Sequence, residues 1–213
     1  ADYGPSGRVQ FIFRELPLPS LHPTAPIAHV AAHCGGEQSA QLYWDLHDAV
    51  FAGQADWTSL ADPTPVLREI AAQLGTDMAA FDECVASGRG EAAIAAGATD
   101  AAARGFDGTP SFEVTGDGVD GTFNIVGAQP LDVFRRYIDS LLNGVAPAEP
   151  APEPGQRPES RLPYWADVAG GLQPDPARPG VNLAGDYYKG NPDAKLIVIE
   201  FSDFQCPFCR DHA

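Results

Sequence analysis

The chain has 213 residues, of which 44% are hydrophobic and 20% charged, a composition typical of a folded globular protein. Its 13 basic and 29 acidic residues give a formal net charge of −16, which repels phosphate backbones and argues against nucleic acid as a partner. The sequence holds neither the ~18 consecutive apolar residues of a membrane span nor a signal peptide at its start. We therefore expect any membrane contact to be made by a segment outside this chain.

The first predicted elements are a strand and a long helical region. Residues 8–15 alternate between polar and apolar side chains, which is typical of a half-buried strand. After a proline-rich connection, apolar residues recur at helical spacing through residues 25–105, and this range predicts an all-helical block. His29 and His33 fall on its first helix, where we expect them at the surface.

A hairpin and one more helix follow the helical block. Residues 111–114 and 122–126 resemble two strands, and the glycines at 116 and 118 between them indicate a tight turn. Residues 131–142 carry an apolar stripe at helical spacing, preceded by Pro130. We expect residues 1–144 to form one folded body.

The composition then changes abruptly. Residues 145–179 hold nine of the twenty prolines, and this density predicts an extended linker over residues 145–180. Beyond it, in residues 181–213, the apolar run of residues 196–201 is typical of a strand covered on both faces. The sequence Cys206-Pro207-Phe208-Cys209 follows at once, at the predicted start of a helix.

A dithiol at the start of a helix has a specific chemistry. Only the thiolate attacks a disulfide, and free N–H groups at a helix N-terminus favour the anion at Cys206. Pro207 suits the first turn because it has no N–H to leave unpaired, and Cys209 lies one turn on, where it can resolve a mixed disulfide.

A zinc site is the alternative. Zinc needs four ligands, and the chain has no second C-x-x-C, although His33, Cys34 and His212 could be recruited. We therefore expect no metal and no other cofactor.

Residues 200–209, which read EFSDFQCPFC, resemble the active-site strand and helix start of DsbA-type thiol-disulfide oxidoreductases. The resemblance implies an α/β, thioredoxin-like fold with an inserted helical domain, which residues 25–105 match. It also implies a Gly-Thr-Pro loop that faces the dithiol, with Thr109 followed by Pro110 as the cis-proline. A proline there donates no hydrogen bond, which leaves neighbouring backbone free to pair with a client.

The resemblance bears on two further positions. Glu200 falls where the family has a buried acid that could relay protons to Cys209, although a polar strand end facing solvent explains it equally well. Phe208 stands where strongly oxidising members have a histidine. The resemblance therefore supports exchange chemistry and leaves the direction of electron flow open.

Cys34 and Cys84 lie on apolar faces of predicted helices in the same block. They could be two small buried thiols or the partners of a structural disulfide. Members of the resembled family often carry a second, structural pair in the helical domain, and we favour the disulfide.

The order of the elements is permuted relative to the resembled fold, because here the active-site strand and helix start come last. The chain is then either a piece of a tandem protein or a circular permutant. In both cases the strand at residues 196–201 can fill a vacant sheet position in residues 1–144, since an uncovered strand edge invites pairing. This docking hypothesis predicts that Cys206 lies near Pro110.

Together these features predict an extracytoplasmic thiol-disulfide oxidoreductase. Its expected partners are client proteins with free thiols or disulfides, and a redox partner that regenerates the dithiol or disulfide. The alternative from another functional class is a non-enzymatic module that binds clients on a thioredoxin-like surface.

Overall fold

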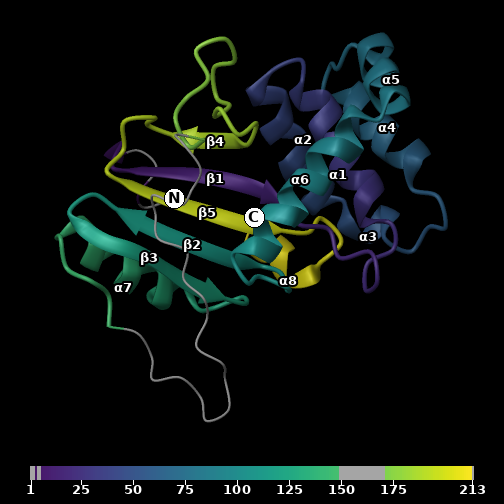
Figure 1. Cartoon of the computed structure of the whole chain (residues 1–213). Helices are drawn as coiled ribbons and strands as arrows, with labels where there is room; N and C mark the ends of the chain where they lie inside the picture. The colour runs from purple at the N-terminus through teal and green to yellow at the C-terminus, as the bar shows by residue number, and fades with distance from the viewer. Residues whose placement is uncertain (1–2, 4–5, 149–170, 213) are drawn as a thin grey trace.

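The computed structural model describes residues 3, 6–148 and 171–212. A five-stranded sheet in the order β3-β2-β5-β1-β4 forms its centre (Figure 1). β1 and β5 run parallel, and the other neighbouring strands run antiparallel. The strands are β1 (Val9–Glu15), β2 (Ser111–Gly116), β3 (Val119–Val126), β4 (Tyr187–Gly190) and β5 (Leu196–Ser202). The chain is therefore a mixed α/β protein with a thioredoxin-like fold, as the sequence predicts.

Six helices between β1 and β2 occupy the range predicted for the helical block, and the name is kept for them here. They lie together beyond one end of the sheet (Figure 1). They are α1 (Ala25–Gly36), α2 (Ala40–Ala52), α3 (Gln54–Trp57), α4 (Thr64–Gln73), α5 (Met78–Ser87) and α6 (Arg89–Ala103). α7 (Leu131–Leu142) follows the hairpin, and α8 (Pro207–Arg210) follows β5.

Local sequence signals set where several of these helices begin and end. The Ser39 hydroxyl accepts a hydrogen bond from the N–H of Leu42 and starts α2, and the Asp77 carboxylate does the same for α5. Gly88, at a φ of 76°, ends α5 in a left-handed conformation that glycine adopts without strain. Between the helices, large buried side chains form one core: Tyr43, Leu46, Phe51, Trp57, Leu67 and Phe81.

The sheet is covered on both faces, which explains the near-continuous apolar sequence of β5. Leu196 and Val198 face α7, whose buried side chains are Phe134, Tyr137, Ile138 and Leu141. Ile199 and Phe201 point the other way and pack with Ile12, Leu16, Ala101, Phe106 and Leu172. This alternation gives the central strand two apolar faces, as the sequence predicts.

The structure adds elements that the sequence did not predict. β4 pairs antiparallel with β1, with Tyr187 opposite Phe13, and its four residues are too few to show a period. α3 is a single short turn of helix. Leu172, within the range predicted as linker, is buried against the sheet. Most of that predicted linker, residues 149–170, lies outside the described residues.

Candidate active site

The register of the sheet brings two distant segments together. Ser111, the first residue of β2, lies opposite Phe201 near the end of β5, and the two strands run antiparallel. The residues that precede β2 therefore meet the residues that follow β5 at one end of the sheet. The first segment contains Thr109 and Pro110, and the second is the dithiol loop, residues 203–206. The Sγ atom of Cys206 lies 3.6 Å from the carbonyl oxygen of Thr109, as the docking hypothesis predicts.

The two cysteines of the C-P-F-C sequence begin α8. Cys206 is the N-cap residue, in an extended conformation, and Pro207 is the first residue of the helix. The N–H of Arg210 donates to the Cys206 carbonyl at 3.3 Å and closes the first turn. Both thiols are free and both side chains are buried, whereas the neighbouring Phe208 is 62% exposed. The exposed apolar ring thus belongs to a residue that stands between two buried cysteines in the chain.

The surroundings of the two sulfurs make them unequal. The Cys209 thiol donates to Cys206 and lowers the pKa of Cys206 to about 6, although burial opposes that shift. The backbone N–H groups of Cys209 and Phe208 add to the stabilisation of the Cys206 anion. Burial, together with the hydrogen bond to Cys206, raises the pKa of Cys209 far above its ordinary value. Cys206 is therefore the thiolate at neutral pH, and Cys209 is the thiol behind it.

The Thr109–Pro110 peptide bond is cis, and Pro110 is buried. The Pro110 carbonyl accepts a hydrogen bond from the N–H of Gly127 at 2.9 Å, and the Ser111 hydroxyl donates to Gly108 at 2.7 Å. These bonds fix the loop on both sides of the proline. The loop therefore holds the Thr109 carbonyl beside Cys206.

Glu200 is buried, with 2% of its surface exposed, on the face of β5 that also carries Val198 and Ser202. A solvent-facing strand end is thereby excluded. Burial raises the pKa of Glu200 to about 7, and the negative charge of Cys206 acts in the same direction. A carboxyl with this pKa exchanges its proton near neutral pH.

Side chains of the helical block and of the loop after β1 hold the dithiol loop. The Asp203 carboxylate accepts from the N–H of Leu18 at 2.8 Å and lies 2.9 Å from His22 Nδ1. Gln54 donates to two carbonyls of the loop, at 2.9 and 3.0 Å. Neither Asp203 nor Gln54 is predicted as a site residue from the sequence. Asp203 lies within the motif that carries the resemblance, whereas nothing in the sequence around Gln54 distinguishes it from a surface glutamine.

The expectation of a surface position for His29 was wrong. His29 is fully buried, its Nε2 accepts the N–H of Phe204 at 3.2 Å, and its Nδ1 bonds to the Glu15 carboxylate. Glu15 also accepts from the Tyr43 hydroxyl at 2.7 Å. Because α1 is packed on nearly all sides, a polar residue outside its predicted stripe is buried too. The four alanines within α1 were the sequence signal that could have predicted a helix buried on nearly all sides.

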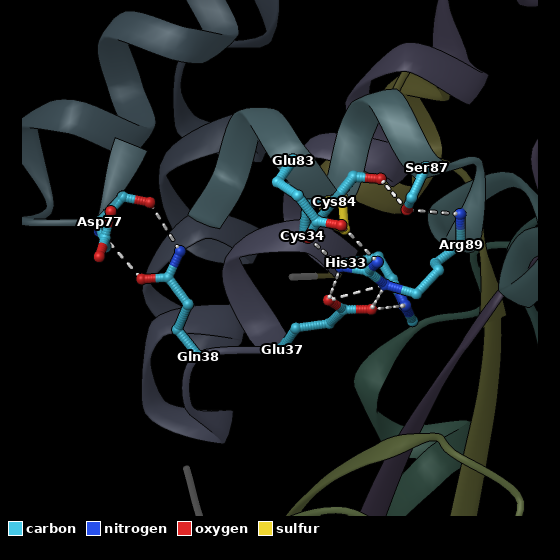
Figure 2. The surroundings of a disulfide bond; sticks show 9 residues. All are labelled: His33, Cys34, Glu37, Gln38, Asp77, Glu83, Cys84, Ser87 and Arg89. Atoms are coloured by element: carbon cyan, nitrogen blue, oxygen red, sulfur yellow. Dashed lines mark hydrogen bonds and ion pairs between the residues drawn. A yellow bond between two sulfur atoms is a disulfide. The ribbon is translucent and has the colours of Figure 1, made fainter. Parts of the chain in front are cut away.

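The second pair of cysteines forms a disulfide between α1 and α5, and both residues are buried (Figure 2). Figure 2 shows Arg89 beside it, paired with Glu37 and Glu83. Because Cys34 is used in this bond, it is not available as the zinc ligand that the sequence had offered. The ring of His212 lies against Phe112 and Phe134 instead. Among the described residues, no group of three or more His, Cys, Asp or Glu side chains could hold a metal ion.

A family model described as thioredoxin matches residues 1–139 and 183–213. The chain belongs to the thioredoxin family. The first matched range contains β1, β2 and β3, and the second contains β4, β5 and the dithiol. The family model therefore matches both of the segments that form the sheet.

Two curated relatives are proteins named as Na(+)/H(+) antiporters. NhaA 3 of Salinispora tropica is 32% identical over 167 residues, which cover 78% of this chain and 22% of that protein. NhaA 1 of Salinispora arenicola is 34% identical over 117 residues, which cover 55% of this chain and 17% of that protein. The chain thus spans about a fifth of these relatives. No solved structure matches. In the described part of this thioredoxin-family chain, every helix is too short or too polar to cross a bilayer.

Proposed function

We propose that this chain is a DsbA-type thiol-disulfide oxidoreductase that exchanges disulfides with cysteines of client proteins. One observation carries the proposal. A buried Cys206 sulfur with a lowered pKa lies 3.6 Å from the Thr109 carbonyl, next to a cis-proline, with a second thiol one helical turn behind it. A low-pKa sulfur beside a resolving thiol is the arrangement that disulfide exchange requires.

In the reducing direction, the Cys206 thiolate attacks one sulfur of a client disulfide. A bond forms between Cys206 Sγ and that sulfur, the client S–S bond breaks, and the other client sulfur leaves as a thiolate that takes a proton from water. Cys206 can make this attack at neutral pH because its pKa of about 6 leaves it largely ionised.

Cys209 resolves the mixed disulfide. It gives up its proton and attacks Cys206 Sγ, which releases the second client thiolate and leaves the Cys206–Cys209 disulfide. Two electrons have then moved from the dithiol to the client. Glu200, with a pKa of about 7 in a buried site, is suited to accept the Cys209 proton. In the oxidising direction the same steps run backwards, and in either direction a second dithiol or disulfide protein must restore the starting form.

The proposal is tested by trapping. With Cys209→Ala the resolving step is lost, so a peptide that carries one cysteine, activated as a mixed disulfide with thionitrobenzoate, should stay covalently bound to Cys206 until dithiothreitol is added. The matched control is Cys206→Ala, which also removes one thiol of the pair but leaves no low-pKa sulfur; it should form no adduct at pH 6. Mass spectrometry measures both.

Turnover is read as insulin reduction by dithiothreitol. We expect Cys206→Ala to lower the catalysed rate to background. A catalysed rate that is equal in wild type and Cys206→Ala would contradict the enzyme and favour the binding-module alternative, in which the surface around Phe208 holds clients without exchange.

We further propose that the protein acts outside the cytoplasm. The buried Cys34–Cys84 disulfide supports this location, because cytosolic reductants keep most thiols reduced. The likeness to proteins named as antiporters is compatible with a place at a membrane, and contact with the membrane would be made by a segment other than the described helices. The exposed Phe208 supplies no positive charge to hold the thiolate, so we propose exchange in both directions and not a dedicated oxidase.

A further inference from the structure

Besides His29, which accepts the Phe204 N–H, Gln54 of the helical block bonds directly to the backbone of the dithiol loop. Gln54 Nε2 donates to the carbonyl of Phe204 at 2.9 Å and to the carbonyl of Cys206 at 3.0 Å. A side-chain amide has two N–H donors, and these two carbonyls use both. Gln54 therefore bridges the loop across Gln205 and ends on the reactive cysteine itself.

Gln54 is held rigidly in its place. It is buried at the start of α3, whose Trp57 is fully buried and donates its indole N–H to the Val50 carbonyl at 3.0 Å. α3 is thereby fastened to the end of α2, and the position of the Gln54 amide is set by the packing of the helical block. Any tilt of that block would be passed to the dithiol loop through these two hydrogen bonds.

We propose that Gln54 is a positioning residue, through which the helical block fixes the dithiol loop and sets the reactivity of the Cys206 sulfur. The consequence for client turnover rests on the proposed function. The effect on the sulfur does not, because the sulfur can be probed without a client.

Gln54 can affect the reactivity of Cys206 because the donors that stabilise the Cys206 anion depend on how the loop is oriented. The Cys206 anion is stabilised by the Cys209 thiol and by the backbone N–H groups of Phe208 and Cys209, all of which depend on the orientation of the first turn of α8. Without the Gln54 donors the Phe204 carbonyl would lose that hydrogen bond and the Cys206 carbonyl would keep only the 3.3 Å bond from the Arg210 N–H, so the loop would turn toward other partners. That movement would take the N–H groups out of line with Cys206 Sγ.

The experiment compares two glutamines of the helical block. Gln54→Met keeps the length of the side chain and removes both donors. Gln38→Met is the matched control, because Gln38 also makes two bonds to backbone, both to Asp77 (Figure 2), which is not part of the dithiol loop. The rate of alkylation of reduced protein by iodoacetamide is measured from pH 4 to pH 9 in a Cys209→Ala background. Glu200, the other titratable group that acts with Cys206, is unchanged in both variants.

We expect Gln54→Met to move the alkylation profile toward higher pH, with about tenfold slower alkylation at pH values well below the parent's pKa for a rise of one pKa unit. The alkylation profile of Gln38→Met should coincide with that of its parent, even if urea unfolding shows that both substitutions destabilise the protein. A Gln54→Met profile identical to that of its parent would overturn the proposal.

If Gln54→Met does not fold, Gln54→Asn serves instead, because it keeps the amide but is too short to reach both carbonyls. We expect it to shift the alkylation profile in the same direction by a smaller amount. An unchanged profile would again reject the proposal. If wild-type protein did not catalyse insulin reduction but Gln54→Met still shifted the alkylation profile, the proposed function would be overturned and this inference would stand.

Discussion

The two cysteine pairs of this protein are buried almost equally and yet are in opposite chemical states. Cys34 and Cys84 are each 1% exposed and form a disulfide, whereas Cys206 and Cys209, at 3% and 0%, are free. Exposure therefore does not separate the structural pair from the reactive pair. The groups around each sulfur do.

The structural pair joins α1 and α5 across a separation of 50 residues, among apolar side chains of the helical block. The reactive pair lies within one helical turn, where the N–H groups of α8 stabilise the Cys206 anion and Gln54 bonds to the backbone of the dithiol loop. Long separation makes the first bond effective at restricting the unfolded chain. Donors directed at a single sulfur make the second pair suitable for exchange.

The largest effect is expected from removing the structural disulfide. The double variant Cys34→Ala/Cys84→Ala should lose about 4 kcal/mol of unfolding free energy, because a loop of this length gives up much entropy when it is closed. Urea unfolding of both proteins, followed by circular dichroism, measures the loss.

The same variant sharpens the comparison. Insulin reduction, measured at a temperature at which both proteins are folded, should be unchanged, because the hydrogen bonds that hold the dithiol loop come from Gln54 and His29 and not from these cysteines. A loss of exchange larger than the loss of folded protein would show that the two pairs act together, and that their division into structural and reactive pairs is wrong.

The next effect concerns two acids, one in each region. Burial raises the pKa of Glu200 to about 7 from the ordinary 4.5, so the folded state binds the proton more tightly than the unfolded state does. Unfolding free energy should therefore fall as pH rises from 4.5 to 7, by up to about 3 kcal/mol. Glu200→Gln removes this penalty, and we expect it to be more stable than wild type at pH 8 and equal to it at pH 4.

Glu83, near the structural disulfide, provides the matched control. Pairing with Arg89 lowers its pKa, so its contribution has the opposite sign: it is present above pH 4.5 and is lost as pH falls through the lowered value. Glu83→Gln should give no gain in stability at pH 8. Equal behaviour of the two variants in urea at pH 4 and pH 8 would mean that Glu200 is not buried as described.

How much of this fold the sequence predicts depends on the length of each element and on whether its apolar residues recur with a recognisable period. β5, the helical block and α7 carry apolar patterns long enough to be recognised, and they lie where the pattern places them. β4 and α3, with four residues each, are too short for a period to appear. Their positions depend on pairing with β1 and on the packing of Trp57, which are properties of the tertiary structure.

The site divides in the same way. Cys206, Cys209 and the Thr109–Pro110 loop could be named from local motifs, because the motif itself carries the chemistry. Gln54 and His29 could not, since each acts on the dithiol loop across at least 150 residues of chain. A buried amide and a surface amide look the same until the elements around them are packed.

The smallest effect is expected from the ion pairs that lie over the structural disulfide. Arg89 pairs with Glu37 and Glu83, and all three side chains are substantially exposed, so their contribution to stability is small.

In Arg89→Ala the rate of Cys34–Cys84 reduction by dithiothreitol should stay at the wild-type value, because the sulfurs are covered by α1 and α5 themselves. Phe81→Ala, which opens the core of the helical block, should instead speed reduction. A tenfold faster reduction in Arg89→Ala would mean that surface charges, and not helix packing, protect the bond. The contrast between the two cysteine pairs would then rest on the surface of the helical block.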